Sequence, residues 1–231
     1  MGKAVVALSW KGGTGKTTIL ASLAYALRRE TPLRVLAVDM TEDALLSQLL
    51  APSCRARGFF DYLEGREPEI CTADDGALVD TLPAGAPRPN VKPKAVKALV
   101  EALKSSYDAV LIDVPGVGDA YNQALTSLML LADIALIVTT PAFIEQAKKI
   151  RAVVDGAPVM AVLNMWTKDS PGKHEVEVIG TSKWGRYAYV VEFDEGAWRS
   201  AIEKKLAVFY KTEFSKIIDR ITSDLFKLIV E

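Results

Sequence analysis

The 231-residue chain is poor in the side chains that build metal and redox centres. It has one histidine, His174, and two cysteines, Cys54 and Cys71, which are far apart in the sequence and form no Cys-x-x-Cys pair. This scarcity argues against a metal or iron–sulfur site, and it fits thiols that stay reduced in a cytosol. His174 lies in a polar run, residues 169–177, so we expect it in a surface loop and not in a catalytic site.

The chain also lacks long apolar runs and a strong net charge. No run approaches the ~20 residues that a membrane span needs. Residues 1–3 lead directly into an apolar segment, which leaves no room for a signal peptide, so we expect a cytoplasmic protein. The net charge is −1, so binding to nucleic acid or membrane would need a local patch. Half of the residues are hydrophobic, which is ample for one covered core.

Short apolar segments alternate with amphipathic ones along the chain. This order predicts a single α/β domain over residues 1–231, with a mostly parallel sheet of about seven or eight strands and helices on both faces. Such sheets bind ligands beyond the carboxyl ends of their strands. We expect strands at 4–8, 33–38, 77–82, 109–112, 134–138, 159–163 and 187–191. We expect helices at 16–29, 42–50, 94–105, around 125–131, and at 146–154, 196–209 and 212–230.

The most informative segment is Ser-Trp-Lys-Gly-Gly-Thr-Gly-Lys-Thr-Thr, residues 9–18, which follows the first apolar run. Its glycines allow backbone N–H groups to converge on an anion, and the following helix adds the positive end of its dipole. The backbone from Gly12 through Gly13, Thr14 and Gly15 to Thr18 would hold phosphates. Lys16 would reach the β- and γ-phosphates, and the Thr17 hydroxyl would ligate Mg²⁺.

The segment departs from the common phosphate-loop pattern at its start. Trp10 stands where that pattern has its first glycine, and a second lysine, Lys11, precedes the glycine pair. Lys11 has no function on its own γ-phosphate, because Lys16 already serves that position. The alternative is a chance glycine-rich turn with a solvated lysine, and the strand and helix on either side weigh against it. Trp10 could contact the nucleotide or a facing subunit, whereas Trp166, Trp184 and Trp198 are expected to be packing residues.

This run closely resembles the deviant Walker A motif of the ParA/MinD family of P-loop ATPases. The resemblance implies ATP and Mg²⁺ as ligands and an ATP-dependent homodimer, in which Lys11 contacts the nucleotide of the partner. It also implies that Asp113, which ends an apolar strand, holds Mg²⁺ as a Walker B aspartate. Residues 113–118, Asp-Val-Pro-Gly-Val-Gly, are similar to the family's second switch loop, whose glycines would permit rearrangement.

The chain differs from the family at its first switch. Asp39 matches the first aspartate of an Asp-x-Asp pattern, but Thr41 stands where the family has the aspartate that orients the attacking water. A threonine can hydrogen-bond a water but cannot accept its proton as a carboxylate does. Glu42 or Asp43 could take this role from an offset position, or Asp39 could itself serve as the base and so support the attacking water. We therefore expect slow hydrolysis.

Other segments extend the resemblance over residues 3–164. Residues 57–65, 80–85, 131–133 and 139–141 are similar to successive family segments. Asn164 stands where family members have an asparagine near the adenine, although an asparagine that caps a strand end would look the same. Beyond residue 164 the resemblance is only architectural.

The carboxyl-terminal third bears on partners. The helix expected at 212–230 mixes cations and anions on its polar side, whereas a membrane-surface helix has a cationic face, so we expect it to pack on its own sheet. Basic residues near aromatic ones suit non-specific DNA, as in ParA proteins, and ordinary solvated surface is the alternative. The candidates are Lys183, Trp184, Gly185, Arg186, Tyr187, Arg199, Lys204 and Lys205.

The resemblance implies an ATP-dependent dimerisation switch of the ParA type, for plasmid or chromosome partition on the nucleoid, stimulated by a separately encoded adaptor. A MinD-like positioning ATPase would need a cationic tail. An iron–sulfur carrier or electron-delivering member of the superfamily would need paired cysteines. An ATP-binding scaffold with little turnover stays open because of Thr41.

Overall fold

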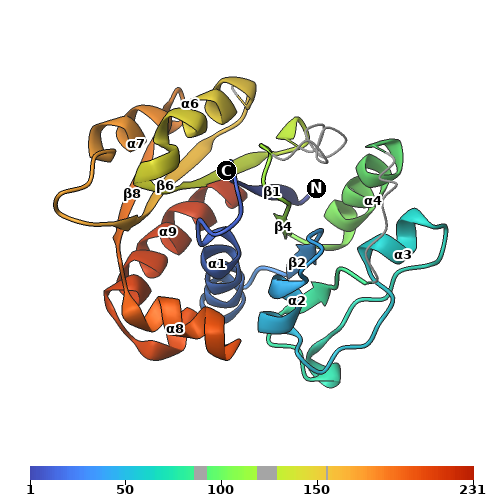
Figure 1. Ribbon diagram of the computed structural model, residues 1–231. Coiled ribbons are helices and arrows are strands. Elements are labelled where there is room, and N and C mark those ends of the chain that lie inside the picture. The colour runs from blue at the N-terminus through green and yellow to red at the C-terminus, as the bar shows by residue number, and fades with distance from the viewer. Residues whose placement is uncertain (86–92, 119–128, 155) are drawn as a thin grey trace.

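The computed structural model describes residues 1–85, 93–118, 129–154 and 156–231, and its central feature is an eight-stranded sheet (Figure 1). The strand order is β3-β2-β4-β1-β5-β6-β8-β7, and every pairing is parallel except that of β7 with β8. The predicted mostly parallel sheet of seven or eight strands is confirmed. The strands are β1 (Lys3–Leu8), β2 (Val35–Asp39), β3 (Asp80–Leu82), β4 (Ala109–Asp113), β5 (Ile134–Thr139), β6 (Val159–Trp166), β7 (Thr181–Ser182) and β8 (Gly185–Glu192).

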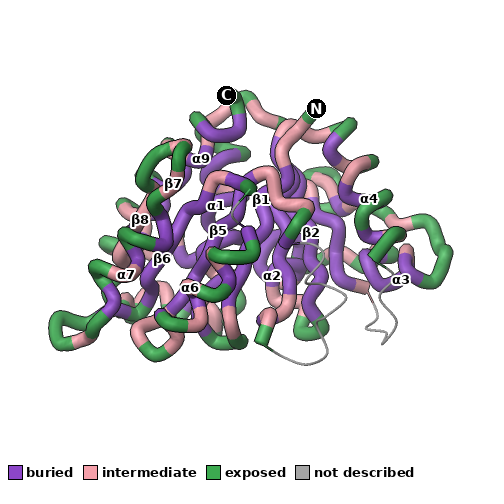
Figure 2. Tube along the Cα trace, turned by 90° about the horizontal axis from the view of Figure 1, so that it is seen from above, coloured by how far each residue is buried: buried purple, intermediate pink, exposed green. Residues whose placement is uncertain are grey.

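Helices cover both faces of the sheet, and the strands lie buried between them (Figure 2). Side chains alternate along each strand: Val6 packs on one face of the sheet, and its neighbours Val5 and Ala7 pack on the other. The first face is covered by α3 (Phe59–Leu63), α4 (Pro93–Ser106), α6 (Ile144–Val153) and α7 (Lys173–Ile179). The second face is covered by α1 (Lys16–Glu30), α2 (Leu45–Leu50) and α9 (Glu213–Val230).

Helix α9 packs on the sheet, as its balanced charge predicted. Ile218, Ile221 and Leu225 are fully buried in the core cluster that α9 shares with α1. Its apolar stripe is therefore already occupied within the chain. Among the helices in the described part of the chain, none is both long and apolar enough to cross a bilayer.

Backbone geometry moves several predicted boundaries. Helix α2 begins at Leu45 and not at residue 42, because Ala44 adopts a left-handed conformation with φ 52°. The helix predicted over 196–209 stops at Glu203, the end of α8 (Glu195–Glu203), because Lys204 is left-handed, and a 3₁₀ turn, Ala207–Tyr210, follows. The helix predicted around 125–131 lies mostly outside the described residues.

Two side-chain predictions were wrong in part. His174 is exposed, as expected, but it lies in the first turn of α7 and not in a loop. Trp166 is buried in the core, whereas the Trp198 side chain is 52% exposed. Trp198 is left open because α8 turns this residue toward a cavity at the carboxyl edge of the sheet.

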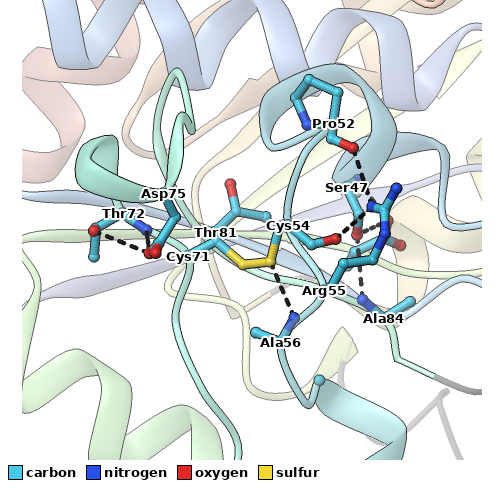
Figure 3. Close-up of a disulfide and its surroundings, with 12 residues drawn as sticks. Ser47, Pro52, Cys54, Arg55, Ala56, Cys71, Thr72, Asp75, Thr81 and Ala84 are labelled. Carbon is cyan, nitrogen blue, oxygen red and sulfur yellow. Dashed lines mark hydrogen bonds between the residues drawn. A yellow bond between two sulfur atoms is a disulfide. The ribbon is translucent and has the colours of Figure 1, made fainter.

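The expectation of two separate, reduced cysteines is also wrong. Cys54 and Cys71 are joined by a disulfide, with their Cα atoms 6.0 Å apart (Figure 3). The backbone of Cys71 pairs antiparallel with Thr81 in β3, and this pairing brings it back beside the loop that follows α2. The juxtaposition depends on tertiary pairing, so the sequence spacing could not reveal it.

Candidate functional site at the carboxyl edge of the sheet

The loop between β1 and α1 forms an open cradle. Gly13 and Gly15 have φ values of 79° and 81°, which favour glycine, and Gly15 directly precedes the first turn of α1. A Cβ on Gly12 or Gly13 would meet nothing within 4 Å, so the backbone of both faces open space. A Cβ on Gly15 would lie 2.2 Å from Asn164 Nδ2, so only glycine fits there.

Asn164, at the carboxyl end of β6, supports this cradle. Its Nδ2 donates a hydrogen bond of 2.8 Å to the carbonyl of Thr14. The Thr14 hydroxyl itself is buried and has no hydrogen-bond partner among the described residues. A buried unpaired hydroxyl is costly unless a ligand or water satisfies it. The strand end thus positions the loop, and the loop offers an unused polar group.

Lys16, Thr17 and Asp113 meet at the base of the cradle. The Lys16 ammonium forms a buried ion pair with Asp113 Oδ1, and the Thr17 hydroxyl donates to Asp113 Oδ2 at 2.6 Å. Asp113 is fully buried at the end of β4, beside β1. The lysine ammonium can bind a phosphate, and the hydroxyl and the carboxylate supply the oxygen ligands that Mg²⁺ prefers.

Asp39, the last residue of β2, is fully buried and tightly bonded. Its Oδ1 accepts from the Thr41 backbone N–H and hydroxyl at 3.0 and 2.6 Å, and its Oδ2 accepts from the Ser47 N–H and hydroxyl at 2.8 Å each. Burial raises the pKa of Asp39, the nearby charge of Asp113 raises it further, and the hydrogen bonds from Thr41 and Ser47 oppose both effects. The carboxylate therefore fixes the link from β2 to α2.

Lys11 and Trp10 lie where the cradle meets the loop that follows β4. Lys11 is exposed, and a Cβ on Gly116 would lie 2.9 Å from the Lys11 Cα. The Gly118 N–H donates to the Trp10 carbonyl at 2.9 Å, and a Cβ on Gly118 would lie 2.8 Å from the indole ring. Glycine at positions 116 and 118 lets the loop after β4 pack closely on the loop after β1. This is in addition to the rearrangement that glycines in a switch loop would permit.

These residues line a cavity of about 960 Å³. One wall consists of the cradle from Lys11 to Thr18, and Thr41, Glu42 and Pro115 border it. Another wall, formed by residues at and after the ends of β6 and β8, is mostly apolar, although Glu192 and Asp194 also line it. Its side chains include Met165, Phe193, Trp198 and Phe214.

Sequence reasoning missed this apolar wall and also Phe60, which reaches the cavity from α3. Phe60 belongs to the family-like segment 57–65, the residues of the apolar wall belong to no recognised motif, and all of them converge only in the folded chain. The one local signal is Asp194, whose side chain accepts from the Ala197 N–H at 2.8 Å and caps α8 beside the cavity.

The basic residues considered for DNA do not form one cluster along the chain. Lys183 and Arg186 lie on the β7–β8 hairpin at the amino end of β8, whereas Arg199, Lys204 and Lys205 follow its carboxyl end, on and after α8. Lys183 stacks on Trp184, with its Nζ 4.4 Å from the ring centroid. Others have acidic partners: the pairs are Arg186–Glu177, Arg199–Glu195 and Lys205–Glu203.

Comparison with known proteins identifies this arrangement. Residues 5–207 match the family model "CobQ/CobB/MinD/ParA nucleotide binding domain". The septum site-determining protein MinD of Bacillus subtilis is 34% identical over 173 residues, which are 71% of this chain and 60% of that protein. The chain therefore spans about three fifths of this relative's length.

Solved structures agree with the family match. MinD of Pyrococcus horikoshii, complexed with Mg-ADP, superposes with a TM-score of 0.80 at 26% identity, covering 99% of this chain and 97% of that one. A ParA family ATPase of Chlorobium tepidum shares the fold, with a TM-score of 0.75 at 21% identity over 96% and 99% of the two chains. The chain belongs to the CobQ/CobB/MinD/ParA family of nucleotide-binding domains.

Proposed function

We propose that the chain is a Mg-ATP-dependent dimerisation switch that hydrolyses ATP slowly. The observation that carries the proposal is the buried group of Lys16, Thr17 and Asp113 beneath an open glycine cradle. Phosphoryl transfer leaves little covalent work for a protein, so positioning and charge supply most of the catalysis. The site offers both positioning and charge, together with an apolar wall suited to the nucleobase of a bound nucleotide.

The residues present fit magnesium and a nucleoside triphosphate. Within the part of the chain that the structure describes, the Thr14 hydroxyl is buried without a partner, and Gly12 and Gly13 face open space. Thr17 and Asp113 supply the hydroxyl and carboxylate oxygens that Mg²⁺ prefers, and these two residues would hold it. When bound, the ion would offset charge on the β- and γ-phosphates. The ammonium of Lys16 would exchange its carboxylate partner for phosphate oxygens.

Slow hydrolysis follows from the state of Asp39. Among the described residues, the hydrogen bonds to its two oxygens come from Thr41 and Ser47, and the Thr41 hydroxyl lies 2.8 Å from Asp43 Oδ1 as well. Because each oxygen already accepts two hydrogen bonds, Asp39 would act on a water through Thr41 and not by direct contact. Asp39 would thus act as a positioning residue for the first switch.

Steady-state hydrolysis of Mg-ATP by the wild type and by Asp39→Ala tests this role. We expect a low wild-type turnover that falls further in the variant, with nucleotide affinity measured alongside to separate binding from chemistry. A brisk wild-type rate that Asp39→Ala leaves unchanged would remove Asp39 from the mechanism. Single-turnover measurements would also distinguish a slow ATPase from an ATP-binding scaffold.

Lys11 would complete the site of a second copy of the chain. It is exposed at the rim of the cavity, where no partner within the described residues engages its ammonium. Light scattering with Mg-ADP, Mg-ATP and a slowly hydrolysed analogue tests this assembly. We expect a dimer only with the triphosphates, lost in Lys11→Ala and retained in the exposed control Lys168→Ala. A triphosphate-loaded monomer in the wild type would refute the switch.

Two uses of such a switch are proposed. Non-specific DNA binding for partition is supported by exposed cations such as Lys183 and Lys204, although their neighbours Arg186 and Lys205 have acidic partners. ATP- and salt-dependent retention of arbitrary duplex DNA tests it. Retention that survives the double change Arg186→Glu and Lys205→Glu would exclude this surface.

The second use is positioning of a division-site component, together with a separately encoded adaptor. It is supported by the B. subtilis relative, whose name assigns it to septum-site determination. Absence of DNA binding in the Mg-ATP dimer would favour this use over partition. Co-purification of an adaptor only with the Mg-ATP-loaded dimer would support it directly.

A further inference from the structure

The segment from residue 51 to residue 79 lies at the β3 edge of the sheet. Helix α3 and Val79 anchor it in the two main cores, whereas the stretches around Cys54 and Cys71 share a small cluster of their own. Its buried apolar residues are Ala51, Cys71 and Ala77, with Cys54 and Ala56 packed against them. This cluster is separate from the two main cores of the sheet. Such a cluster buries little apolar area, so the segment depends on other contacts for its order.

The disulfide is the strongest of those contacts. It connects Cys54, in the loop after α2, with Cys71, whose N–H and carbonyl bond to Thr81 at 2.8 and 2.9 Å (Figure 3). Cys71 is 1% exposed, whereas Cys54 is half-buried and accepts a weak hydrogen bond from the Ala56 N–H. One sulfur of the pair is therefore within reach of a small thiol from solvent.

The cross-linked segment is continuous with two walls of the nucleotide cavity. Helix α2, just before it, carries Ser47, which donates to Asp39 and accepts from the Ala84 N–H at 3.2 Å. The Ala84 carbonyl in turn accepts from the N–H of Phe60, a residue that lines the cavity. Ser47 thus joins the first switch, the end of β3 and α3 in one hydrogen-bonded group.

We propose that Cys54 and Cys71 are a reversible thiol–disulfide pair that adjusts the nucleotide affinity of this cavity. This inference rests on the proposed nucleotide-binding function. With the bond intact, the closed loop of chain has fewer open conformations, so the segment and the Ser47 group stay in place. With the bond reduced, only the small cluster and the backbone bonds of Cys71 to Thr81 hold the stretches around the two cysteines. They then open more often, and this opening loosens the neighbouring hydrogen-bonded group of Ser47, Ala84 and Phe60.

The chemistry balances as ordinary thiol–disulfide exchange with a small thiol such as glutathione. The external thiolate attacks the sulfur of the half-buried Cys54 and forms a mixed disulfide with it. The bond between the protein's own two sulfurs breaks, and Cys71 leaves as a thiolate that takes up a proton. A second external thiol releases Cys54. Two external thiols are thereby oxidised to one disulfide as the protein gains two thiols. Glutathione disulfide drives the reverse reaction.

The test compares the intact wild type after equilibration with glutathione disulfide and after reduction. Alkylation and intact mass count the free thiols, hydrogen exchange follows residues 51–85, and a fluorescent ATP analogue with Mg²⁺ gives the Kd. We expect no free thiols in the first form and two in the second, faster exchange on reduction, and a Kd about fivefold higher. The double variant Cys54→Ala and Cys71→Ala should resemble the reduced form under both conditions.

The possible outcomes separate this inference from the proposed function. Equal, measurable affinities in both redox states would overturn the redox inference and leave nucleotide binding intact. Faster exchange without a change in Kd would overturn it too, because the coupling would be missing. Failure of both redox forms to bind the analogue would refute both proposals. The wild-type comparison needs no substitution, so poor folding of the variant would not obscure it.

Discussion

At the scale of single residues, the most informative feature is a pair of buried carboxyl groups at the ends of two neighbouring strands. Asp39 and Asp113 end the neighbouring strands β2 and β4 in matching register, and both are fully buried. Asp113 is compensated by Lys16 and Thr17, and Asp39 is compensated only by hydrogen bonds. A buried carboxylate without partners would be very costly, so each of these contacts is needed for stability as well as for function.

Thr41 provides a test of this dependence. Thr41→Val keeps the shape but removes the hydroxyl that donates to Asp39 at 2.6 Å. A lost hydrogen bond to a charged group costs about 1.5–3 kcal/mol, so the free energy of unfolding should fall by that amount. Thr41→Ser keeps the donor and should lose less. Urea unfolding measures both, and equal losses in the two variants would contradict this role of the hydroxyl.

At the scale of elements, close backbone contacts decide how the segments dock. Gly58, just before α3, packs against the end of β3: a Cβ there would lie 2.1 Å from the Pro83 carbonyl oxygen and 2.5 Å from the Gly85 nitrogen. These are backbone atoms that cannot rotate away. The glycine therefore allows α3 to bond to the strand end, where Phe59 donates to the Pro83 carbonyl at 2.8 Å.

Replacement of this glycine should be damaging. We expect Gly58→Ala to lower the free energy of unfolding by about 2–4 kcal/mol, in the severe range for single substitutions. Gly156→Ala is a matched control, since a Cβ there meets nothing within 4 Å, and it should stay within about 0.5 kcal/mol of the wild type. Chemical denaturation compares them. Similar stabilities would mean that α3 can dock in another way.

A hydrogen bond between the residue directly after α4 and the first residue of β3 predicts that the free energy of unfolding depends on pH. The Tyr107 hydroxyl donates to Asp80 at 3.1 Å, and burial together with the charge of Asp80 raises the pKa of Tyr107 from 10.0 to about 12. Between these pH values the folded chain keeps a proton that the unfolded chain has lost. The contribution of this tyrosine is therefore complete below pH 10 and disappears as the pH rises toward 12.

Tyr107→Phe isolates this contribution. At neutral pH the variant should be less stable than the wild type by about 1 kcal/mol, the usual net value of one hydrogen bond. The difference in unfolding free energy should shrink between pH 10 and 12. Urea titrations at several pH values would show it, and a difference that grows with pH would reverse the proposed sign.

At the scale of the whole molecule, ligand binding and assembly should change stability together. A ligand at 100 times its Kd stabilises the folded state by about 2.7 kcal/mol, which corresponds to a melting temperature roughly 5–11 °C higher for a chain of this size. If Mg-ATP also assembles the chain, its melting temperature should rise further with protein concentration. With Mg-ADP, the concentration dependence should be absent.

Thermal scans at two protein concentrations would measure both effects. The same scans with EDTA in place of Mg²⁺ serve as a control, and they should show a smaller shift because Thr17 and Asp113 would lack the ion. A melting temperature that does not depend on protein concentration in Mg-ATP would contradict the dimer. No shift with either nucleotide would contradict binding itself.

The sequence by itself determined most strands and the longer helices, the mostly parallel sheet and the glycine cradle with Lys16, because apolar periodicity and the glycine-rich run are local patterns. It did not predict the short elements α3, α7 and β7. Tertiary structure alone decided the rest. Only in the folded chain does Ser47 hydrogen-bond to Asp39, and only there does Trp198 line the cavity. The disulfide between Cys54 and Cys71 likewise depends on the fold. Local periodicity reports which face a residue presents, but only packing brings distant faces together.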